Sequence, residues 1–252
     1  PKTSIGREFS ENFPRGHAHT RTRTHTRKNM RKIRVLIACE ESQTEVIEFR
    51  KAGCLAFSCD LQICSGNHPG WHVIGDCLAL FQTPCVFRTQ DGKKHTVIHW
   101  DLVISHPPCT YLSRAAGRYL FSGHVLNKER YQLGLLAKEF FMACYNVDAP
   151  FVVVENPVPF RIFNLPRPTC YVHPSDFGAP WIKKTLYWLK NLPPIMPTIF
   201  HPNPRSFVYS TRGGKKRSKS FQEIAKQMVE QWLPIIRNSL RENNKSKRRA
   251  LN

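Results

Sequence analysis

Four short apolar segments, each followed by polar residues, limit most strongly what this chain can fold into. They are Arg34–Ala38, Leu55–Cys59, Asp101–Ser105 and Pro150–Val154. Such short apolar runs are typical of parallel strands that helices cover on both faces. Amphipathic spacing predicts helices between and after them, at Thr44–Ala52, Asn127–Val147 and Phe221–Leu240. This alternation predicts an α/β fold with a doubly wound, mostly parallel sheet, to which Thr185–Leu189 adds a strand.

Polar or reactive residues stand at the end of each apolar segment. They are Cys39-Glu40-Glu41-Ser42, Asp60, His106-Pro107-Pro108-Cys109 and Glu155-Asn156. In doubly wound sheets, ligands bind outside the carboxyl ends of the strands. We therefore expect these groups to face one cleft, and we expect residues 61–99 to be irregular.

The positive charge of the chain is concentrated at its two ends. Residues 1–32 hold nine Lys and Arg against two acids, and residues 212–252 hold twelve against three, within a net charge of +20. Two basic ends on a nearly neutral body predict a polyanionic partner, most simply nucleic acid. Solvated tails without a partner are the alternative interpretation.

The low-complexity stretch HAHTRTRTHTRK has no apolar face to bury, so residues 1–32 are predicted to be a disordered basic extension. Residues 33–240 are then the folded domain, and residues 241–252 a basic tail. Met30 precedes the first strand and is a candidate functional start, while an organelle transit peptide is the alternative for the extension.

Nothing in the sequence predicts a secretory signal or a membrane span, because no run of 18 apolar residues occurs. We expect an intracellular monomer, cytoplasmic or nuclear, whose nine cysteines are reduced thiols. No metal is expected. The cluster of Cys59, Cys64, His68, His72 and Cys77 matches no common zinc spacing, although a structural zinc site is the alternative.

Cys109 and Glu155 together indicate a reaction. The Pro107-Pro108 pair stiffens a strand end and presents a nucleophilic thiol. Glu155 follows the apolar run FVVV, so burial is expected to raise its pKa and favour a protonated carboxyl that donates a hydrogen bond. A thiolate and a proton donor suit attack on C6 of cytosine with protonation at N3, after which C5 can accept a methyl group.

These residues resemble an ordered series of motifs in a known family. The stretches VLIACEESQTEVIEFRKAGCLAFSCD, Gly75-Asp76, DLVISHPPCTYLS and VVVENP are similar to those of the DNA cytosine-5 methyltransferases, and especially to short phage and prophage proteins of that kind. The resemblance runs from about Arg34 to Leu189. It implies a class I methyltransferase-like fold that uses S-adenosylmethionine (SAM) to methylate cytosine in DNA through a covalent cysteine adduct.

The resemblance also assigns roles to residues. Cys109 matches the nucleophile, Glu155 the residue at cytosine N3, Asn156 its neighbour that shapes the loop, and Lys183 a basic residue of the Gly178-x-Pro180 segment. For SAM, Asp60 matches the residue at the ribose and Asp76 the acid near the adenine. The remaining cofactor positions are the first loop and the strand-end turn, at Cys39, Glu40, Glu41, Ser42 and Pro107.

The chain departs from the family pattern at Trp181 and Thr185, where the family has Gln and a second Arg, and in two further regions. The first cofactor loop, CEESQT, has no glycine, so Glu40 or Glu41 is expected to pair with the amino group of SAM. After Lys190 there is no room for a sizeable target-recognition domain. We expect specificity to be low, or to come from a partner or from residues 61–99 and 114–125.

Three other functions stay open. An amino methyltransferase acting on an exocyclic nitrogen also has a proline pair at a strand end, and it would yield an N-methylated base. A catalytically inactive nucleic-acid-binding protein on the same scaffold would bind DNA regardless of SAM. RNA is the alternative substrate for the cytosine-5 reaction, because a flipped cytosine presents the same chemistry in either polymer.

Overall fold

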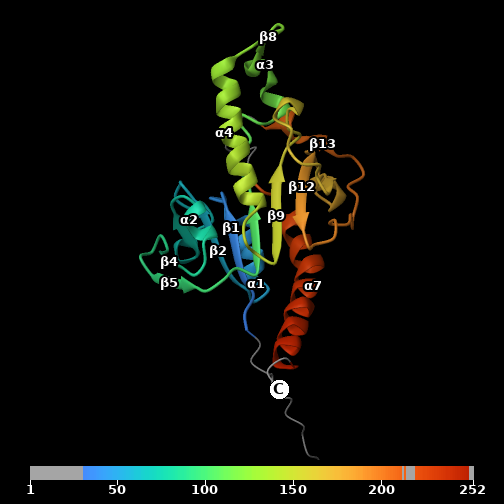
Figure 1. Ribbon diagram of the computed structural model, residues 1–252. Coiled ribbons are helices and arrows are strands. Elements are labelled where there is room, and N and C mark those ends of the chain that lie inside the picture. The colour runs from blue at the N-terminus through green and yellow to red at the C-terminus, as the bar shows by residue number, and fades with distance from the viewer. Residues whose placement is uncertain (1–30, 212, 214–218, 250–252) are drawn as a thin grey trace, which may run out of the picture. The chain divides into compact units, whose positions relative to one another are not determined.

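The computed structural model, which describes residues 31–211, 213 and 219–249, arranges seven strands in one sheet (Figure 1). From edge to edge the strands are β10 (Cys170–Val172), β12 (Thr185–Lys190), β9 (Phe151–Asn156), β6 (Leu102–Ser105), β1 (Arg34–Ala38), β2 (Leu55–Asp60) and β3 (His72–Ile74). Neighbouring strands from β9 to β3 are parallel, whereas β12 is antiparallel to both β9 and β10. The expected doubly wound α/β fold, with a mostly parallel sheet, is confirmed.

Helices and small hairpins surround this sheet. The described helices are α1 (Thr44–Lys51), α2 (Leu78–Phe81), α3 (Gly117–Leu120), α4 (Lys128–Tyr145), α5 (Phe207–Ser210) and α7 (Gln222–Arg249). Three further strand pairs are β4 (Cys85–Arg88) with β5 (Lys94–Val97), β7 (Phe121–Ser122) with β8 (Val125–Leu126), and β11 (Trp181–Ile182) with β13 (Arg205–Ser206). In the part of the chain that is described, no helix is long and apolar enough to cross a membrane.

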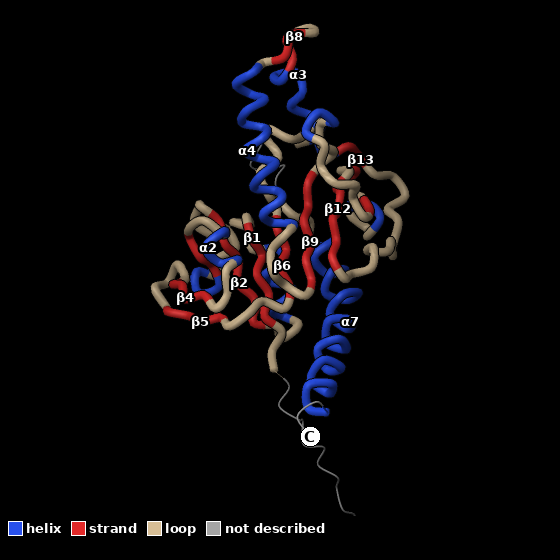
Figure 2. Tube along the Cα trace, viewed as in Figure 1, coloured by secondary structure: helices blue, strands red, loops and turns tan. Residues whose placement is uncertain are grey.

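Both faces of the sheet are covered because side chains alternate along each buried strand. Val35 and Ile37 of β1 pack in one apolar cluster with α1 and α7, and Leu36 and Ala38 pack in a second cluster with α4. Figure 2 shows helices on either side of the strands. Each large apolar side chain buried in this way contributes about 1.5–3 kcal/mol. The all-apolar strands therefore specify a sheet enclosed by two layers of helix.

Most of the predicted long elements are confirmed with small changes at their ends. β1 has the predicted bounds, and α1 ends one residue earlier than expected, at Lys51. The last helix is longer than expected, since α7 continues to Arg249 and includes residues 241–249. The prediction that residues 61–99 are irregular was wrong, because they contain β3, α2 and the β4–β5 hairpin. These elements have three or four residues each, too few for a periodic pattern.

An extension lies at the carboxyl ends of the parallel strands. Between β6 and α4 the chain forms α3 and the β7–β8 hairpin, and Figure 1 shows them with the start of α4 beyond the arrowhead of β9. Helix α4 begins at Lys128 after Asn127, whose side chain accepts a hydrogen bond from the backbone N–H of Arg130. Of the predicted disordered extension, residues 1–30 lie outside the described residues, which begin at Arg31.

Candidate active site

The ends of β6 and β9 hold the predicted catalytic segment. The two strands are parallel neighbours with Ser105 beside Val154, so His106–Cys109, which follow β6, lie beside Glu155-Asn156, the last two residues of β9. The buried Asn156 donates a hydrogen bond from Nδ2 to the backbone oxygen of Pro107 over 2.9 Å. The Pro-Pro-Cys turn is therefore held by the strand that carries Glu155.

Cys109 begins a tight turn that exposes part of its side chain. Its backbone oxygen accepts hydrogen bonds from the N–H groups of Leu112 at 3.1 Å and Ser113 at 2.9 Å. Burial raises the pKa of the thiol, and the negative charge of Glu155 raises it further, while the positive charge of Lys183 lowers it. With a net upward pKa shift, Cys109 rests as a neutral thiol that needs a base to become nucleophilic.

Glu155 differs from the expectation drawn from its apolar strand. Burial raises the pKa of its carboxyl, but the hydrogen bond from His106 and the charges of Lys183 and His106 outweigh burial, so the pKa is lower than usual. The predicted protonated carboxyl was therefore wrong, and Glu155 is an ionised carboxylate. The sequence pattern signalled burial correctly, but it gave no sign that a cation would lie against this carboxylate.

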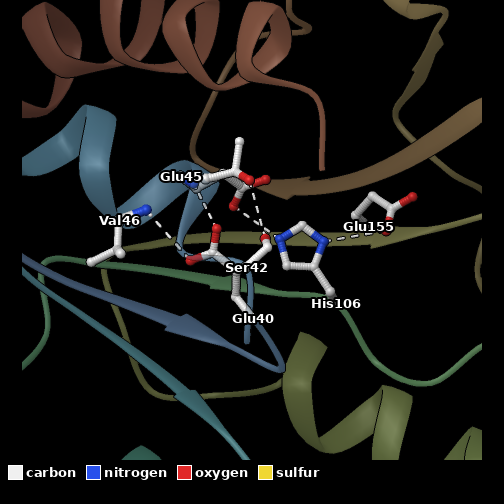
Figure 3. A network of polar contacts seen from close by, with 7 residues as sticks. Glu40, Ser42, Glu45, Val46, His106 and Glu155 are labelled. Carbon is white, nitrogen blue, oxygen red and sulfur yellow. Dashed lines mark hydrogen bonds and ion pairs between the residues drawn. The ribbon is translucent and has the colours of Figure 1, made fainter. Parts of the chain in front are cut away.

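That cation is His106, which lies between two carboxylates (Figure 3). Its Nε2 is 2.9 Å from Oε2 of Glu45, in the first turn of α1, and its Nδ1 is 3.3 Å from Oε2 of Glu155. Burial lowers the pKa of the imidazole, but the charge of Glu45 and the hydrogen bonds to both carboxylates raise it well above its usual value. His106 is therefore an imidazolium that donates in both directions.

A small pocket surrounds this network. It is lined by Glu45, His106, Glu155, Lys183, Thr185, Tyr187, Ser220, Phe221 and Ile224. Lys183 lies between β11 and β12, and its Nζ is 5.5 Å from the ring centre of Phe221. The predicted catalytic residues Glu155 and Lys183 thus share this pocket, whereas Cys109 is not among its lining residues, although the charges of both act on the pKa of its thiol. Sequence reasoning missed Glu45 and Tyr187, because an acid in a helix and a tyrosine in a strand carry no distinguishing pattern.

The glycine-free loop after β1 is held by side chains. Cys39 and Gln43 have φ values of 61° and 59°, a left-handed conformation that usually favours glycine. The buried Gln43 exchanges hydrogen bonds with the backbone of His68, at 2.9 and 3.0 Å. A Cβ on Gly66 would lie 2.6 Å from Cβ of Gln43. Gly66 therefore lets its own loop pack closely against the loop after β1.

Glu40 and Glu41 of this loop have different surroundings. The Glu40 carboxylate accepts hydrogen bonds from the backbone N–H groups of Glu45 at 2.6 Å and Val46 at 3.4 Å, so it caps helix α1 (Figure 3). Burial and the neighbouring Glu45 raise the pKa of Glu40 to about 8. Glu41 lies 3.7 Å from Nζ of Lys219, and its buried Oε2 has no hydrogen-bond partner among the described residues.

The other predicted cofactor residues lie at the same edge of the sheet. Asp60 ends β2 and Asp76 follows β3, and each carboxylate accepts a hydrogen bond through Oδ1, from the N–H of Gln62 and Leu78. Leu61, next to Asp60, leaves 76% of its side chain exposed. Ser42 pairs with Thr44, and Sγ of Cys39 lies 3.9 Å from Sγ of Cys77. Carboxylate acceptors beside exposed apolar side chains fit the ribose and adenine of a nucleoside cofactor.

The cysteine and histidine side chains between positions 59 and 77 do not form a candidate metal centre in the described part of the chain. His72 is buried, with Nδ1 2.9 Å from Oγ of Ser58 and Nε2 2.8 Å from the oxygen of Gln62. His68 stacks on Trp71, and Sγ of Cys59 donates to the oxygen of Gly75. Cys59, His68, His72 and Cys77, which were grouped by spacing, thus have separate partners.

Comparison with known proteins gives distant structural likenesses. No protein-family model matches the chain, and no curated protein matches it. A solved structure described as a candidate DNA modification methyltransferase encoded within an E. coli prophage is 17% identical, with a TM-score of 0.39. The match covers 69% of this chain and 53% of the other, so this chain spans about half the length of that protein. The fold assignment accordingly rests on the sheet order.

Proposed function

We propose that this protein is a SAM-dependent methyltransferase that transfers a methyl group to C5 of cytosine in DNA through a covalent adduct with Cys109. The proposal is supported by one observation. The thiol of Cys109, the carboxylate of Glu155 and the ammonium group of Lys183 come together at the carboxyl edge of the sheet. Glu155 and Lys183 both act on the pKa of Cys109. The turn that carries the thiol is bound to the strand that carries the carboxylate, through Asn156 and Pro107.

The resting protonation states suggest how the adduct forms. Cys109 is a neutral thiol and Glu155 is an ionised carboxylate. We infer that Glu155 accepts the thiol proton as the bond between Sγ and C6 forms, and passes that proton to N3 of the cytosine. The thiol hydrogen thus ends on the ring nitrogen, and Glu155 is ionised before and after the step. Lys183 stabilises the negative charge, which is on the Glu155 carboxylate at rest and develops on sulfur when the thiol proton is removed.

SAM, when bound, supplies the electrophilic methyl group. Asp60 would accept hydrogen bonds from the ribose hydroxyls, Asp76 would lie near the adenine, and Leu61 would pack against the base. Glu41, whose buried oxygen lacks a partner among the described residues, is the better candidate of the two loop glutamates for the amino group of SAM. The Glu40 carboxylate is already engaged by α1. The C5 proton would then be lost to solvent and the Cys109 thiolate expelled. The proton on N3 would return through Glu155 to the thiolate, so that the methylated base and the free thiol are released.

A DNA substrate fits the charge and the layout of the chain. A cytosine in a duplex must be flipped out before a thiol can reach C6, at a cost of a few kcal/mol. The Lys and Arg side chains of the segment 212–252 would bind DNA phosphates without recognising the base sequence. In the described part of the chain, only β13 and α5 lie between β12 and α7. We therefore propose that any base reading comes from the extension between β6 and α4.

The test is transfer of labelled methyl groups from SAM to mixed DNA and to RNA, comparing the wild-type protein with Cys109→Ser. The expected result is label in 5-methylcytosine of DNA that disappears in the variant. Cys170→Ser is the matched control, because that thiol is also partly buried but lies in the edge strand β10 and not in the Pro-Pro-Cys turn. Label on an exocyclic nitrogen would replace this proposal with an amino methyltransferase, and label in RNA alone would change the substrate.

Cofactor binding needs its own measurement. Asp60→Asn should weaken SAM binding about 10- to 100-fold, since a hydrogen bond to a charged group contributes about 1.5–3 kcal/mol. Asp91→Asn, in the β4–β5 turn, is the control. If the wild-type protein bound DNA but neither bound SAM nor transferred a methyl group, the inactive nucleic-acid-binding protein would be the correct interpretation.

A further inference from the structure

His106 links two elements that are far apart in the sequence. One ring nitrogen contacts Glu45 of α1 at 2.9 Å, and the other contacts Glu155 of β9 at 3.3 Å. Only 11% of the His106 side chain and 2% of the Glu45 side chain are exposed to solvent. A buried ion pair of this kind contributes little net stability compared with apolar residues of the same volume. Its presence one residue before the Pro-Pro-Cys turn therefore needs another explanation.

The charges around the ring are nearly balanced. The titratable groups that face His106 or its partners are Glu45 of α1, Glu155 of β9, Lys183 and Tyr187 beside the pocket, and Glu40 against Glu45. Burial and the nearby carboxylates raise the pKa of Tyr187 well above its usual value, so this phenol stays neutral. Two carboxylates thus share the imidazolium, and Lys183 adds a second positive charge near Glu155.

We propose that His106 is a positioning residue, anchored by Glu45, that binds one oxygen of Glu155 and preserves its negative charge so that the carboxylate can accept the Cys109 proton. This inference rests on the proposed function and adds two residues to it. The contact with His106 engages Oε2 of Glu155, which leaves Oε1 as the oxygen for the thiol and the base. Glu45 in turn fixes the ring from the opposite side.

The proposal balances the proton transfer without a further reactant. The proton leaves Sγ of Cys109, is carried by Glu155, and ends on N3 of the ring, while both imidazole protons stay on His106. Without the imidazolium, burial would favour the protonated form of Glu155. A protonated Glu155 cannot accept the thiol proton, so attack on C6 would slow. The proposal thus predicts a pH effect, which a simple packing role would not produce.

The first test is the pH dependence of methyl transfer in wild-type protein and in His106→Asn. Asparagine can still donate a hydrogen bond to Glu155 but carries no charge. In the wild type the lowered pKa of Glu155 keeps the base form available into the acid range. In His106→Asn that pKa should rise, so activity should be lost at a higher pH, by about one unit or more for one removed charge. His201→Asn, in the loop before β13, should keep the wild-type profile.

The second test uses the free protein and needs no activity. Nuclear magnetic resonance of labelled histidine should show His106 protonated on both nitrogens at neutral pH. Glu45→Gln keeps a hydrogen-bond acceptor but removes a charge, so the His106 titration midpoint should fall by about 1–3 units. Thermal unfolding of each variant reports whether the fold is intact. This measurement decides the charge of His106 even where a variant is too unstable to assay.

The outcomes separate this inference from the function on which it rests. The role of His106 alone would be overturned by an active wild-type protein in which His106 is neutral. It would also be overturned if methyl transfer by the wild type and by His106→Asn were lost at the same acid pH. A wild type that transfers no methyl group from SAM would overturn the proposed function, and this role with it. The inference is supported if His106 is charged and if methyl transfer by His106→Asn is lost at a higher pH than transfer by the wild type.

Discussion

The side-chain amide of Asn156 binds the backbone oxygen of Pro107 over 2.9 Å, which joins the last residue of β9 to the turn that presents Cys109. The backbone of Asn156 pairs with Leu186 in the sheet, so this residue belongs to both the ladder and the turn. Its side chain is fully buried. This hydrogen bond therefore ties the turn that carries Cys109 to the strand that carries Glu155.

Asn156→Ala should loosen the turn without touching the thiol. The Pro107 oxygen would lose its partner in a buried place, at a cost of about 1–3 kcal/mol in the free energy of unfolding. We also expect the rate of methyl transfer to fall, because small misplacements of a nucleophile are costly. Chemical denaturation and single-turnover transfer measure the two effects.

Asn191→Gly is the matched control for this variant. Asn191 donates the same kind of bond, from Nδ2 to the oxygen of Pro150 at 2.8 Å, but in an exposed position at the opposite end of β9. Glycine tolerates the φ of 59° at this position. A small loss of stability and an unchanged transfer rate are expected. Equal losses of activity in both variants would show that Asn156 acts only through stability.

Lys183→Gln should make Cys109 less acidic. The positive charge of Lys183 lowers the pKa of Cys109 against the larger effects of burial and Glu155, so its removal lets the thiol pKa rise further. The rate of alkylation by iodoacetamide follows the thiolate fraction, and its pH midpoint should therefore move upward. Lys184→Gln is the control, because Nζ of Lys184 lies 4.1 Å from the ring centre of Tyr171 and outside the pocket lining. Identical alkylation profiles in wild type and Lys183→Gln would contradict an electrostatic role for Lys183.

The sequence predicted the architecture well because the long elements carry strong local signals. Apolar runs such as Arg34–Ala38 and Phe151–Val154 are typical of central strands, because such strands are buried on both faces of the sheet. Their polar ends were predicted to face one cleft. Of those strand-end residues, His106 and Glu155 line the pocket, and Asp60, Cys109 and the loop after β1 do not. The sequence failed for β3, which has three residues and is a strand only because it pairs with β2.

The electrostatics of the site could not be predicted from the sequence. The apolar run before Glu155 correctly indicated burial, but the protonation state depends on His106, 49 residues away along the chain. Glu45 lies 61 residues from His106 and looks like an ordinary acid in the first turn of a helix. The close packing of Gly66 against Gln43, in the loop after β1, likewise forms only in the folded protein.

Glu40 should make stability depend on pH. In the folded protein burial raises its pKa from 4.5 to about 8. Between these values the folded protein keeps a proton that the unfolded chain releases, so the free energy of unfolding falls as the pH rises. Glu40→Gln lacks this titration but can still accept the N–H of Glu45. The variant should therefore gain stability relative to wild type toward pH 8, on the order of a few kcal/mol. Urea titrations across this pH range measure the free energy of unfolding of both proteins. A difference between wild type and Glu40→Gln that did not change with pH would refute the prediction.

The extension at the carboxyl edge carries an aromatic and basic cluster suited to nucleic acid. Tyr119 leaves 53% of its side chain exposed, and the guanidinium carbons of Arg118 and Arg130 lie 4.7 and 5.1 Å from its ring centre. Arg130 also donates to the backbone oxygen of Thr110, at 2.8 Å, so the cluster is tied to the residue after Cys109. Stacking of a base on an aromatic side chain contributes about 1–3 kcal/mol.

Tyr119→Ala should accordingly weaken binding of single-stranded DNA by roughly five- to hundredfold, and Arg118→Ala should reduce the salt dependence by about one counterion. Fluorescence anisotropy at several salt concentrations measures both effects. Tyr171→Ala is the matched control, because Tyr171 is 56% exposed and also lies under a cation, Lys184, but belongs to the edge strand β10. If Tyr171→Ala weakened binding as much as Tyr119→Ala, the DNA would be held by general charge and stacking, and the extension would have no special role. If only Tyr119→Ala did so, the substrate would approach over the turn that carries Cys109, as the direction of attack on a flipped cytosine requires.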